Sequence, residues 1–198
     1  MKEQIILASA SPRRKELLDQ IGVSYLVYPV DVDETPQFEE VPEEYVCRVA
    51  VEKSAACIKL VDSFLPILAA DTSVVLDGQI MGKPENKEHA QSMLSQLSGK
   101  THYVYSAVSF RTNNKNTESI HKLILSKTEV RFRKIRSGEI QSYWETGEPQ
   151  GKAGAYAIQG LASIFVESIT GSFSGVVGLP LYETAELLSK QGIKVLHE

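Results

Sequence analysis

The spacing of hydrophobic and polar residues divides the chain into short apolar runs and amphipathic stretches. Apolar runs predict buried strands at 4–8, 24–30 and 66–70, the last ending at Asp71. Apolar residues three and four positions apart predict helices at 12–21, 42–61, 85–97, 137–144 and 180–191. Further strands are predicted at 72–76, just after the Asp77-Gly78 turn, and at 101–112, 118–134 and 164–169. This mixed order predicts an α/β fold whose sheet is partly antiparallel.

Proline and glycine mark where the predicted elements begin and end. Pro12 and Pro42 stand at the first position of a helix, where the missing N–H costs no hydrogen bond. The polar run at 112–117 predicts a loop between the two long strands. Seven of the 13 glycines lie between Gly147 and Gly178, which predicts a loop-rich region whose backbone approaches another group closely.

Length and composition limit the classes of protein to consider. A chain of 198 residues without a repeat or a linker is expected to form one domain over residues 1–198. The net charge of −4 gives no general attraction for nucleic acid or an anionic membrane. Cys47 and Cys57 lie ten residues apart in a predicted helix, a rise of about 15 Å, so they cannot pair. Free thiols are typical of the cytoplasm, and the few Cys and His residues argue against a closed zinc site.

Two arginines occupy an unusual place at the start of the first predicted helix. With Ser11 as N-cap and Pro12 as the first helical residue, Arg13 and Arg14 fall in the first turn. A cation there is unfavourable by roughly 0.3–1 kcal/mol, because the helix N-terminus already carries partial positive charge. A phosphate bound by the backbone N–H groups, both guanidinium groups and the hydroxyls of Ser9 and Ser11 would reverse this cost. Alternatively, the arginines face solvent or acidic partners.

Carboxylates gather at two places that follow predicted strands. Asp31, Asp33 and Glu34 form an acidic loop whose oxygens suit a hard divalent cation, although a solvated acidic turn has the same composition. Asp71 closes its predicted strand, and ligands of open α/β sheets gather beyond the carboxyl ends of strands. The same aspartate could instead cap a turn.

Two lysines add candidate cations for an anionic ligand. Lys53 lies within the apolar stripe of the 42–61 helix, so its ammonium either reaches solvent along its stem or enters a pocket. Lys83 follows Gly82 in a stretch that faintly imitates a P-loop, but Pro84 replaces the required Ser or Thr, which excludes a Walker-type ATPase. Lys83 remains a candidate phosphate contact. Cations beside metal-type carboxylates suit polyphosphate chemistry.

Six stretches of sequence together carry a family resemblance. In chain order they are LASASPRRKELL, VDVDE, EKSAA, LAADTSVVLDGQIMGKP, KAGAYAIQG and VVGLPLYET. Over residues 5–190 the chain resembles the Maf family of nucleotide pyrophosphatases. The resemblance implies an elongated α/β fold similar to that of the inosine triphosphate pyrophosphatases, with a long mixed sheet and a cleft between two lobes. It also implies metal-dependent attack of water on the α-phosphorus of a nucleoside triphosphate, which yields the monophosphate and pyrophosphate.

The resemblance assigns roles to the candidate residues. Asp71 would accept a proton and hold Mg²⁺ or Mn²⁺, and Glu34 would be a ligand of the metal or of water. Phosphate contacts would come from Ser9 and Ser11 in one loop and from Arg14, Lys53 and Lys83. Arg13, Thr72 and Gln159 resemble the branch that acts on dTTP and UTP. The family also implies a homodimer.

The preference for dTTP and UTP has a physical reading. Uracil and thymine present O2, N3–H and O4 along one edge. The amide of Gln159 can accept from N3–H and donate to one carbonyl, while Arg13 can donate to the other. Cytosine lacks N3–H and would leave these groups mismatched, which is costly in a buried site.

Two other functions remain open at this point. One is a pyrophosphatase that removes modified pyrimidine nucleotides, such as 5-methyl-UTP or pseudouridine triphosphate. The other is a non-catalytic nucleotide-binding regulator of cell division.

Overall fold

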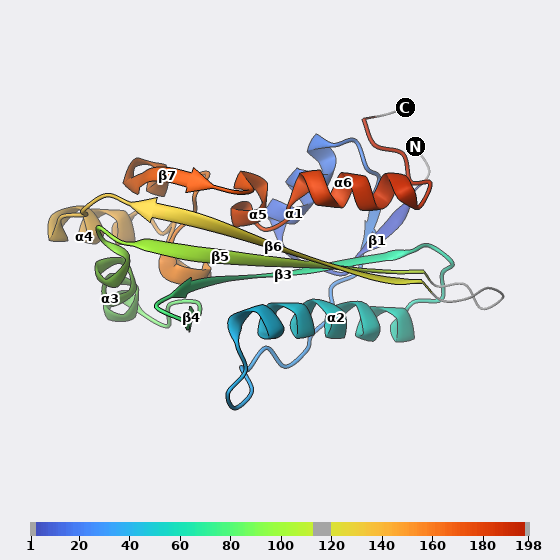
Figure 1. Cartoon of the computed structure of the whole chain (residues 1–198), viewed down its shortest axis with the longest axis horizontal. Coiled ribbons are helices and arrows are strands. Elements are labelled where there is room, and N and C mark those ends of the chain that lie inside the picture. Colours follow the sequence, from blue (N-terminus) through green and yellow to red (C-terminus); the bar gives the residue numbers. More distant parts are fainter. Residues whose placement is uncertain (1–2, 113–119, 197–198) are drawn as a thin grey trace.

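The computed structural model describes residues 3–112 and 120–196 as a long mixed sheet with helices on both faces (Figure 1). The strands are β1 (Ile5–Leu7), β2 (Tyr25–Val27), β3 (Ile67–Leu76), β4 (Gln79–Met81), β5 (Thr101–Arg111), β6 (His121–Phe132) and β7 (Val166–Thr170). The helices are α1 (Pro12–Gln20), α2 (Pro42–Leu60), α3 (Lys87–Leu97), α4 (Ser137–Glu145), α5 (Phe173–Val177) and α6 (Leu181–Lys190).

The sheet combines parallel and antiparallel pairing. Its strand order is β2-β1-β3-β5-β6-β7, and β4 pairs with β3 outside this path. β1 runs parallel to β2 and β3, whereas β3, β5, β6 and β7 are successively antiparallel. The predicted α/β fold with a partly antiparallel sheet is therefore confirmed.

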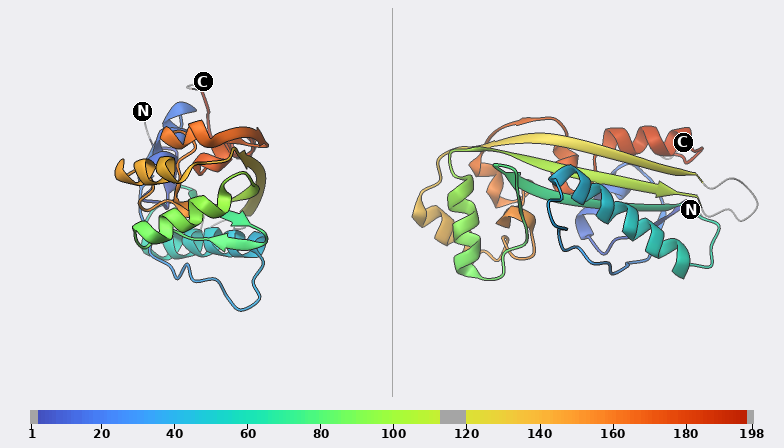
Figure 2. Two further views of the ribbon diagram at one scale, coloured as in Figure 1. Left: turned by 90° about the vertical axis from the view of Figure 1, so that its left-hand side faces the viewer. Right: turned by 60° about the horizontal axis from the view of Figure 1, so that its bottom comes forward.

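The helices cover the two faces of the sheet unequally. α2 lies along one face, while α1, α5 and α6 lie on the other (Figures 1 and 2). α2 packs buried residues such as Val46 and Val49 against Val75 of β3 and Ala107 of β5. A larger apolar cluster joins α1, α3 and α6 to the sheet. None of the helices in the described part of the chain is long and apolar enough to cross a membrane.

Two helices begin where the proline positions predict. Ser11 is the N-cap of α1 with Pro12 next, and Gly22 follows the helix with φ of +69°. Pro42 likewise opens α2, with two glutamates in its first turn. Cys47 and Cys57 both lie in α2 as free thiols, the first half-buried and the second buried.

β3 differs from its prediction in a way that matters for the site. The strand does not end at Asp71 but continues to Leu76, because β5 pairs with it from Ile67 to Val75. On the opposite edge, β1 pairs only as far as Leu68 and β4 begins to pair at Val74. Asp71 therefore lies in the middle of β3, on the part of its edge between the short strands β1 and β4.

The glycine-rich region contains more regular structure than the predicted loop. Two 3₁₀ turns, Ala153–Ala155 and Leu161–Phe165, and the helix α5 lie within it. β7 accordingly begins at Val166 instead of residue 164. Short elements held by tertiary contacts have little periodicity of their own, which explains why they were missed. Most of the predicted 112–117 loop lies outside the described residues.

Gly154 fixes the glycine-rich region against the sheet. Its φ is +65°, and a Cβ at this position would lie 2.9 Å from Cγ1 of Val74, a stiff β-branched side chain. Gly78 also has a positive φ, but no atom lies within 4 Å of a Cβ built there. Gly154→Ala should therefore lower the free energy of unfolding by about 1–3 kcal/mol more than Gly78→Ala does. Urea denaturation of both variants measures the difference, and equal losses would contradict the packing role.

Candidate active site

One cavity of about 780 Å³ brings the predicted site residues together. Its lining comes from the segment after β1, the start of α1, the loop before α2, α2 itself, β3, the segment after β4 and the glycine-rich region. The ten candidate catalytic and substrate-binding residues all line it, namely Ser9, Ser11, Arg13, Arg14, Glu34, Lys53, Asp71, Thr72, Lys83 and Gln159.

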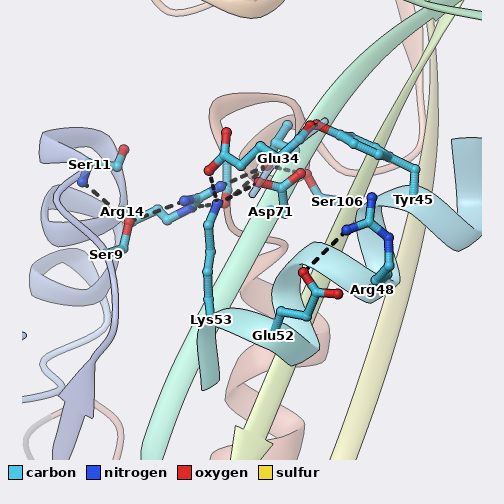
Figure 3. A network of polar contacts seen from close by, with 12 residues as sticks. Ser9, Ser11, Arg14, Glu34, Tyr45, Arg48, Glu52, Lys53, Asp71 and Ser106 are labelled. Carbon is cyan, nitrogen blue, oxygen red and sulfur yellow. Dashed lines mark hydrogen bonds and ion pairs between the residues drawn. The ribbon is translucent and has the colours of Figure 1, made fainter. Parts of the chain in front are cut away.

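Lys53 lies at the centre of the site and contacts two carboxylates. Its Nζ is 2.8 Å from Oδ1 of Asp71 and 2.6 Å from Oε1 of Glu34 (Figure 3). Lys53 and Asp71 are both buried, on the facing elements α2 and β3. Of the two alternatives for Lys53, the ammonium enters the pocket. Lys83 approaches the same group from the rim, with its Nζ 3.8 Å from Oε2 of Glu34.

The acidic residues before α2 separate into different roles. We call residues 28–41, between β2 and α2, the Glu34 loop. Glu34 lines the cavity, whereas Asp33 accepts a hydrogen bond from the backbone N–H of Thr35 at 2.9 Å and Asp31 is exposed. Within residues 3–112 and 120–196, no three His, Cys, Asp or Glu side chains are grouped to hold a metal ion. The solvated-turn alternative therefore fits Asp31 and Asp33, and Glu34 alone of the three joins the site.

The two carboxyl groups differ in their electrostatic environment. Burial raises the pKa of Asp71 above its ordinary value, and the opposing effects of Lys53 and Arg14 are too small to cancel this. Burial also pushes the pKa of Glu34 upward, but the hydrogen bond and charge of Lys53, with Lys83 and Arg14, leave it below its ordinary value. The site thus pairs a carboxyl group with raised proton affinity and a more acidic one, a pattern common in acid–base catalysis.

Arg14 binds three neutral acceptors from distant parts of the chain. Its Nε donates to the carbonyl of Gly178 at 2.9 Å, Nη1 to Oγ of Ser9 at 3.1 Å and Nη2 to Oγ1 of Thr72 at 3.3 Å. Ser9 Oγ also accepts the backbone N–H of Ser11 at 3.2 Å. Burial lowers the pKa of Arg14, while the charge of Asp71 acts in the opposite direction. Arg14 thereby joins the start of α1 to β3 and to the segment before α6.

The start of α1 has the features of an anion site. No side chain caps its first N–H groups. Among the ion pairs of the described residues, none involves Arg13 or Arg14, although both arginines line the cavity. This argues against acidic partners and favours the alternative of a bound anion.

Lys152 and Tyr45 are two polar lining residues among those that were not singled out from the sequence. Lys152 begins the KAGAYAIQG stretch, and burial together with repulsion from Arg13 lowers its pKa. Because this stretch carries the family resemblance, the position of Lys152 within it could have marked this lysine as a candidate site residue. Tyr45 donates its hydroxyl to the backbone carbonyl of Glu34 at 3.0 Å. An aromatic residue near the start of an apolar helix stripe gives no sequence signal of such a contact.

Comparison with known proteins shows which family the chain belongs to. It is 53% identical over 190 residues to a dTTP/UTP pyrophosphatase of Methylococcus capsulatus, covering 96% of this chain and 92% of that protein. It is 51% identical to a dTTP/UTP pyrophosphatase of Nitrosomonas europaea, covering 96% of both. A HAM1 protein structure from Coxiella burnetii aligns with 96% of this chain and all of that one, at 17% identity and a TM-score of 0.49. Residues 4–191 match the family described as Maf-like protein, and the chain belongs to this family.

Proposed function

We propose that this protein hydrolyses dTTP and UTP to the nucleoside monophosphate and pyrophosphate. The observation that carries the proposal is the Asp71–Lys53–Glu34 cluster inside a cavity rimmed with further cations. Proteins about half identical to this chain are named dTTP/UTP pyrophosphatases, which supports the same substrates here.

Asp71 is the group that takes a proton from the attacking water. A buried carboxyl group with a raised pKa is a better base than an ordinary aspartate. The water oxygen forms a bond to the α-phosphorus as the bond to the bridging oxygen breaks, and the electron pair leaves on pyrophosphate. Lys53, which contacts Asp71, holds this carboxylate in place and offers positive charge to the phosphates.

The remaining cations neutralise and position the triphosphate. Arg14 and the uncapped start of α1 lie on one side of the cavity, and Lys83 lies at its rim. Phosphoryl transfer depends mainly on such positioning and charge compensation.

Glu34 and Asp71 fit a divalent cation such as Mg²⁺ or Mn²⁺. Their oxygens lie within 2.8 Å of the same ammonium, so two hard donors stand close together. Mg²⁺ in proteins is commonly held by one or two carboxylates, with substrate phosphates and water as the other ligands. The bound cation would supply charge neutralisation for the triphosphate. We further expect a homodimer, as the family resemblance implies, and a cytoplasmic location, because both cysteines are free thiols.

A panel of nucleoside triphosphates tests this function. Release of pyrophosphate and of phosphate is measured for dTTP, UTP, CTP, GTP, 5-methyl-UTP and pseudouridine triphosphate, with and without Mg²⁺ or Mn²⁺. We expect pyrophosphate from dTTP and UTP only when metal is present. Fastest turnover of a modified nucleotide would move the substrate to that class. Release of phosphate alone, or no turnover of any nucleotide, would refute the proposal.

Gln159 tests how the base is chosen. Its side chain is exposed at the cavity wall, on the segment that follows the 3₁₀ turn Ala153–Ala155. Gln159→Glu removes the amide donor, so the ratio of kcat/KM for UTP over CTP should fall by more than about tenfold. Steady-state assays of both nucleotides measure the ratio. An unchanged ratio would show that Gln159 does not read the base.

The two arginines at the start of α1 should have separable effects. Arg14→Ala should raise KM for all nucleoside triphosphates by a similar factor, because Arg14 organises the phosphate end of the site. Arg13→Ala should instead reduce discrimination among bases. Complete steady-state kinetics with UTP and CTP distinguish the two patterns. Identical losses on every nucleotide for both variants would contradict this division.

A further inference from the structure

Side chains of α2 hold the backbone on both sides of Glu34. Arg48 donates from Nη2 to the carbonyl of Thr35 at 3.1 Å and from Nη1 toward the carbonyl of Asp33 at 3.5 Å. Tyr45 donates its hydroxyl to the carbonyl of Glu34 itself at 3.0 Å. The consecutive carbonyl groups of residues 33, 34 and 35 are therefore all bound by side chains of one helix.

Arg48 is itself fixed by a second part of the same loop. Its Nε and Nη2 contact the two carboxylate oxygens of Glu40 at 2.6 and 2.9 Å. The exposed fractions of the two side chains are only 19% and 6%, so this bidentate pair is stronger than an ordinary surface ion pair. Glu40 also accepts the backbone N–H of Gln37 at 2.9 Å. Arg48 thus ties both limbs of the Glu34 loop to α2.

Apolar burial holds the first part of the Glu34 loop, where the half-buried Val30 and Val32 pack against the core, but it contributes little after Val32. Residues 33–39 are all exposed, and the aromatic ring nearest its tip, that of Phe38, is 93% exposed. The loop projects past the start of α2 in Figure 1. After Val32, the polar contacts of Arg48 and Tyr45 are therefore the main restraints on the loop backbone around Glu34.

The same helix also carries Lys53, which contacts the Glu34 carboxylate. Residues three or four positions apart lie on the same face of a helix. Arg48 follows Tyr45 by three positions and Lys53 follows Val49 by four, so the residues from Tyr45 to Lys53 at these spacings lie along one face of α2. The face that holds the loop is thus continuous with the face that presents the ammonium to Glu34 and Asp71 (Figure 3). α2 therefore fixes the distance between the Glu34 loop and Asp71 of β3.

We propose that Arg48, assisted by Tyr45, is a positioning residue that sets the place of the Glu34 carboxylate in the active site. The inference rests on the proposed function in one respect, which is that Glu34 acts on the triphosphate. Arg48 itself touches no reacting atom and works only through the loop.

Combining Arg48→Met with Glu34→Gln tests this relation. In the otherwise unchanged enzyme, Arg48→Met should lower kcat/KM for UTP by about 10- to 100-fold, as loss of a supporting contact around a reactive group does. In the Glu34→Gln background the same change should cost less than about twofold, because the carboxylate being positioned is already gone. The same loss in both backgrounds would overturn the proposal.

Three further variants distinguish the positioning role from a general loss of folding. Tyr45→Phe removes only the hydroxyl bound to the Glu34 carbonyl, so it should show a smaller loss with the same dependence on Glu34. Arg131→Met breaks an exposed ion pair with Glu167 at 2.8 Å and should leave activity unchanged. Full activity of Arg48→Lys would also overturn the proposal, because lysine keeps the charge but lacks the planar fork.

Hydrogen exchange provides a readout that does not depend on catalysis. Amides of residues 33–35 and 37–40 should exchange faster in Arg48→Met than in the unchanged protein, while those of β5 keep their protection. Unchanged exchange in the loop would overturn the positioning role even in an active enzyme. Absence of pyrophosphate release by the unchanged protein would instead refute the proposed function, and the loop measurement would still stand.

Discussion

Asp71→Asn should lower turnover of UTP by about 10²–10⁴-fold while leaving the protein folded. The amide keeps the size of the carboxyl group and can still accept a hydrogen bond from Lys53, but it cannot take a proton from water. Since burial raises the pKa of Asp71, its ionised form costs the fold some stability above that pKa. Asparagine avoids this cost, so the variant should unfold at no lower urea concentration than the unchanged protein at pH 8. Near-normal turnover would show that Asp71 is not the base.

The pH profile identifies the same group independently. Asp71 must be ionised to act as a base, so kcat/KM should fall as the pH drops through its pKa. That acid limb should lie above the ordinary aspartate value, since kcat/KM reports groups of the free enzyme. The residual activity of Asp71→Asn should lack this limb. An acid limb at the same pH in both proteins would assign it to another group.

Lys53→Met should remove most activity and also destabilise the protein by about 3 kcal/mol at pH 8. Methionine fills similar space, but Asp71 is then left as an ionised carboxylate in a buried position without its ammonium partner. Loss of the positive charge raises the pKa of Asp71 further. The stability deficit should therefore be complete above that pKa and shrink as the pH falls through it, because Asp71 becomes neutral. Urea denaturation at pH 8 and pH 5 measures the trend.

A double variant separates charge from packing in this prediction. Lys53→Met combined with Asp71→Asn removes the buried unpaired carboxylate, and the more exposed Glu34 keeps Lys83 as a neighbouring cation, so most of the lost stability should return. A deficit that is the same at both pH values and is not relieved by Asp71→Asn would mean that Lys53 stabilises the fold by its stem alone.

Local rules predicted the features that depend on neighbouring residues. Pro12 and Pro42 begin helices because the preference of proline for the first position acts within one turn. The arginines after Pro12 violate another local rule, which predicted a phosphate site there, and both arginines line the cavity. Violations of this kind are informative because a fold tolerates them mainly at functional sites.

Features that depend on contacts between distant residues were harder to predict from the sequence. The apolar run of β3 stops at Asp71, so the strand was predicted to end there, whereas pairing with β5 carries it through to Leu76. Tertiary pairing overrides the local pattern in such cases. The apolar stripe of α2 left Lys53 with two alternatives, and only the packing of α2 on β3 decides between them. The contacts of Arg48 join segments that have no common sequence pattern.

Hydrolysis of UTP in ¹⁸O-labelled water tests the central claim most directly. If Asp71 directs water to the α-phosphorus, mass spectrometry should find one labelled oxygen in UMP and none in pyrophosphate. Label in pyrophosphate with none in UMP would mean that water attacks the β-phosphorus, and it would contradict the proposed geometry of the site.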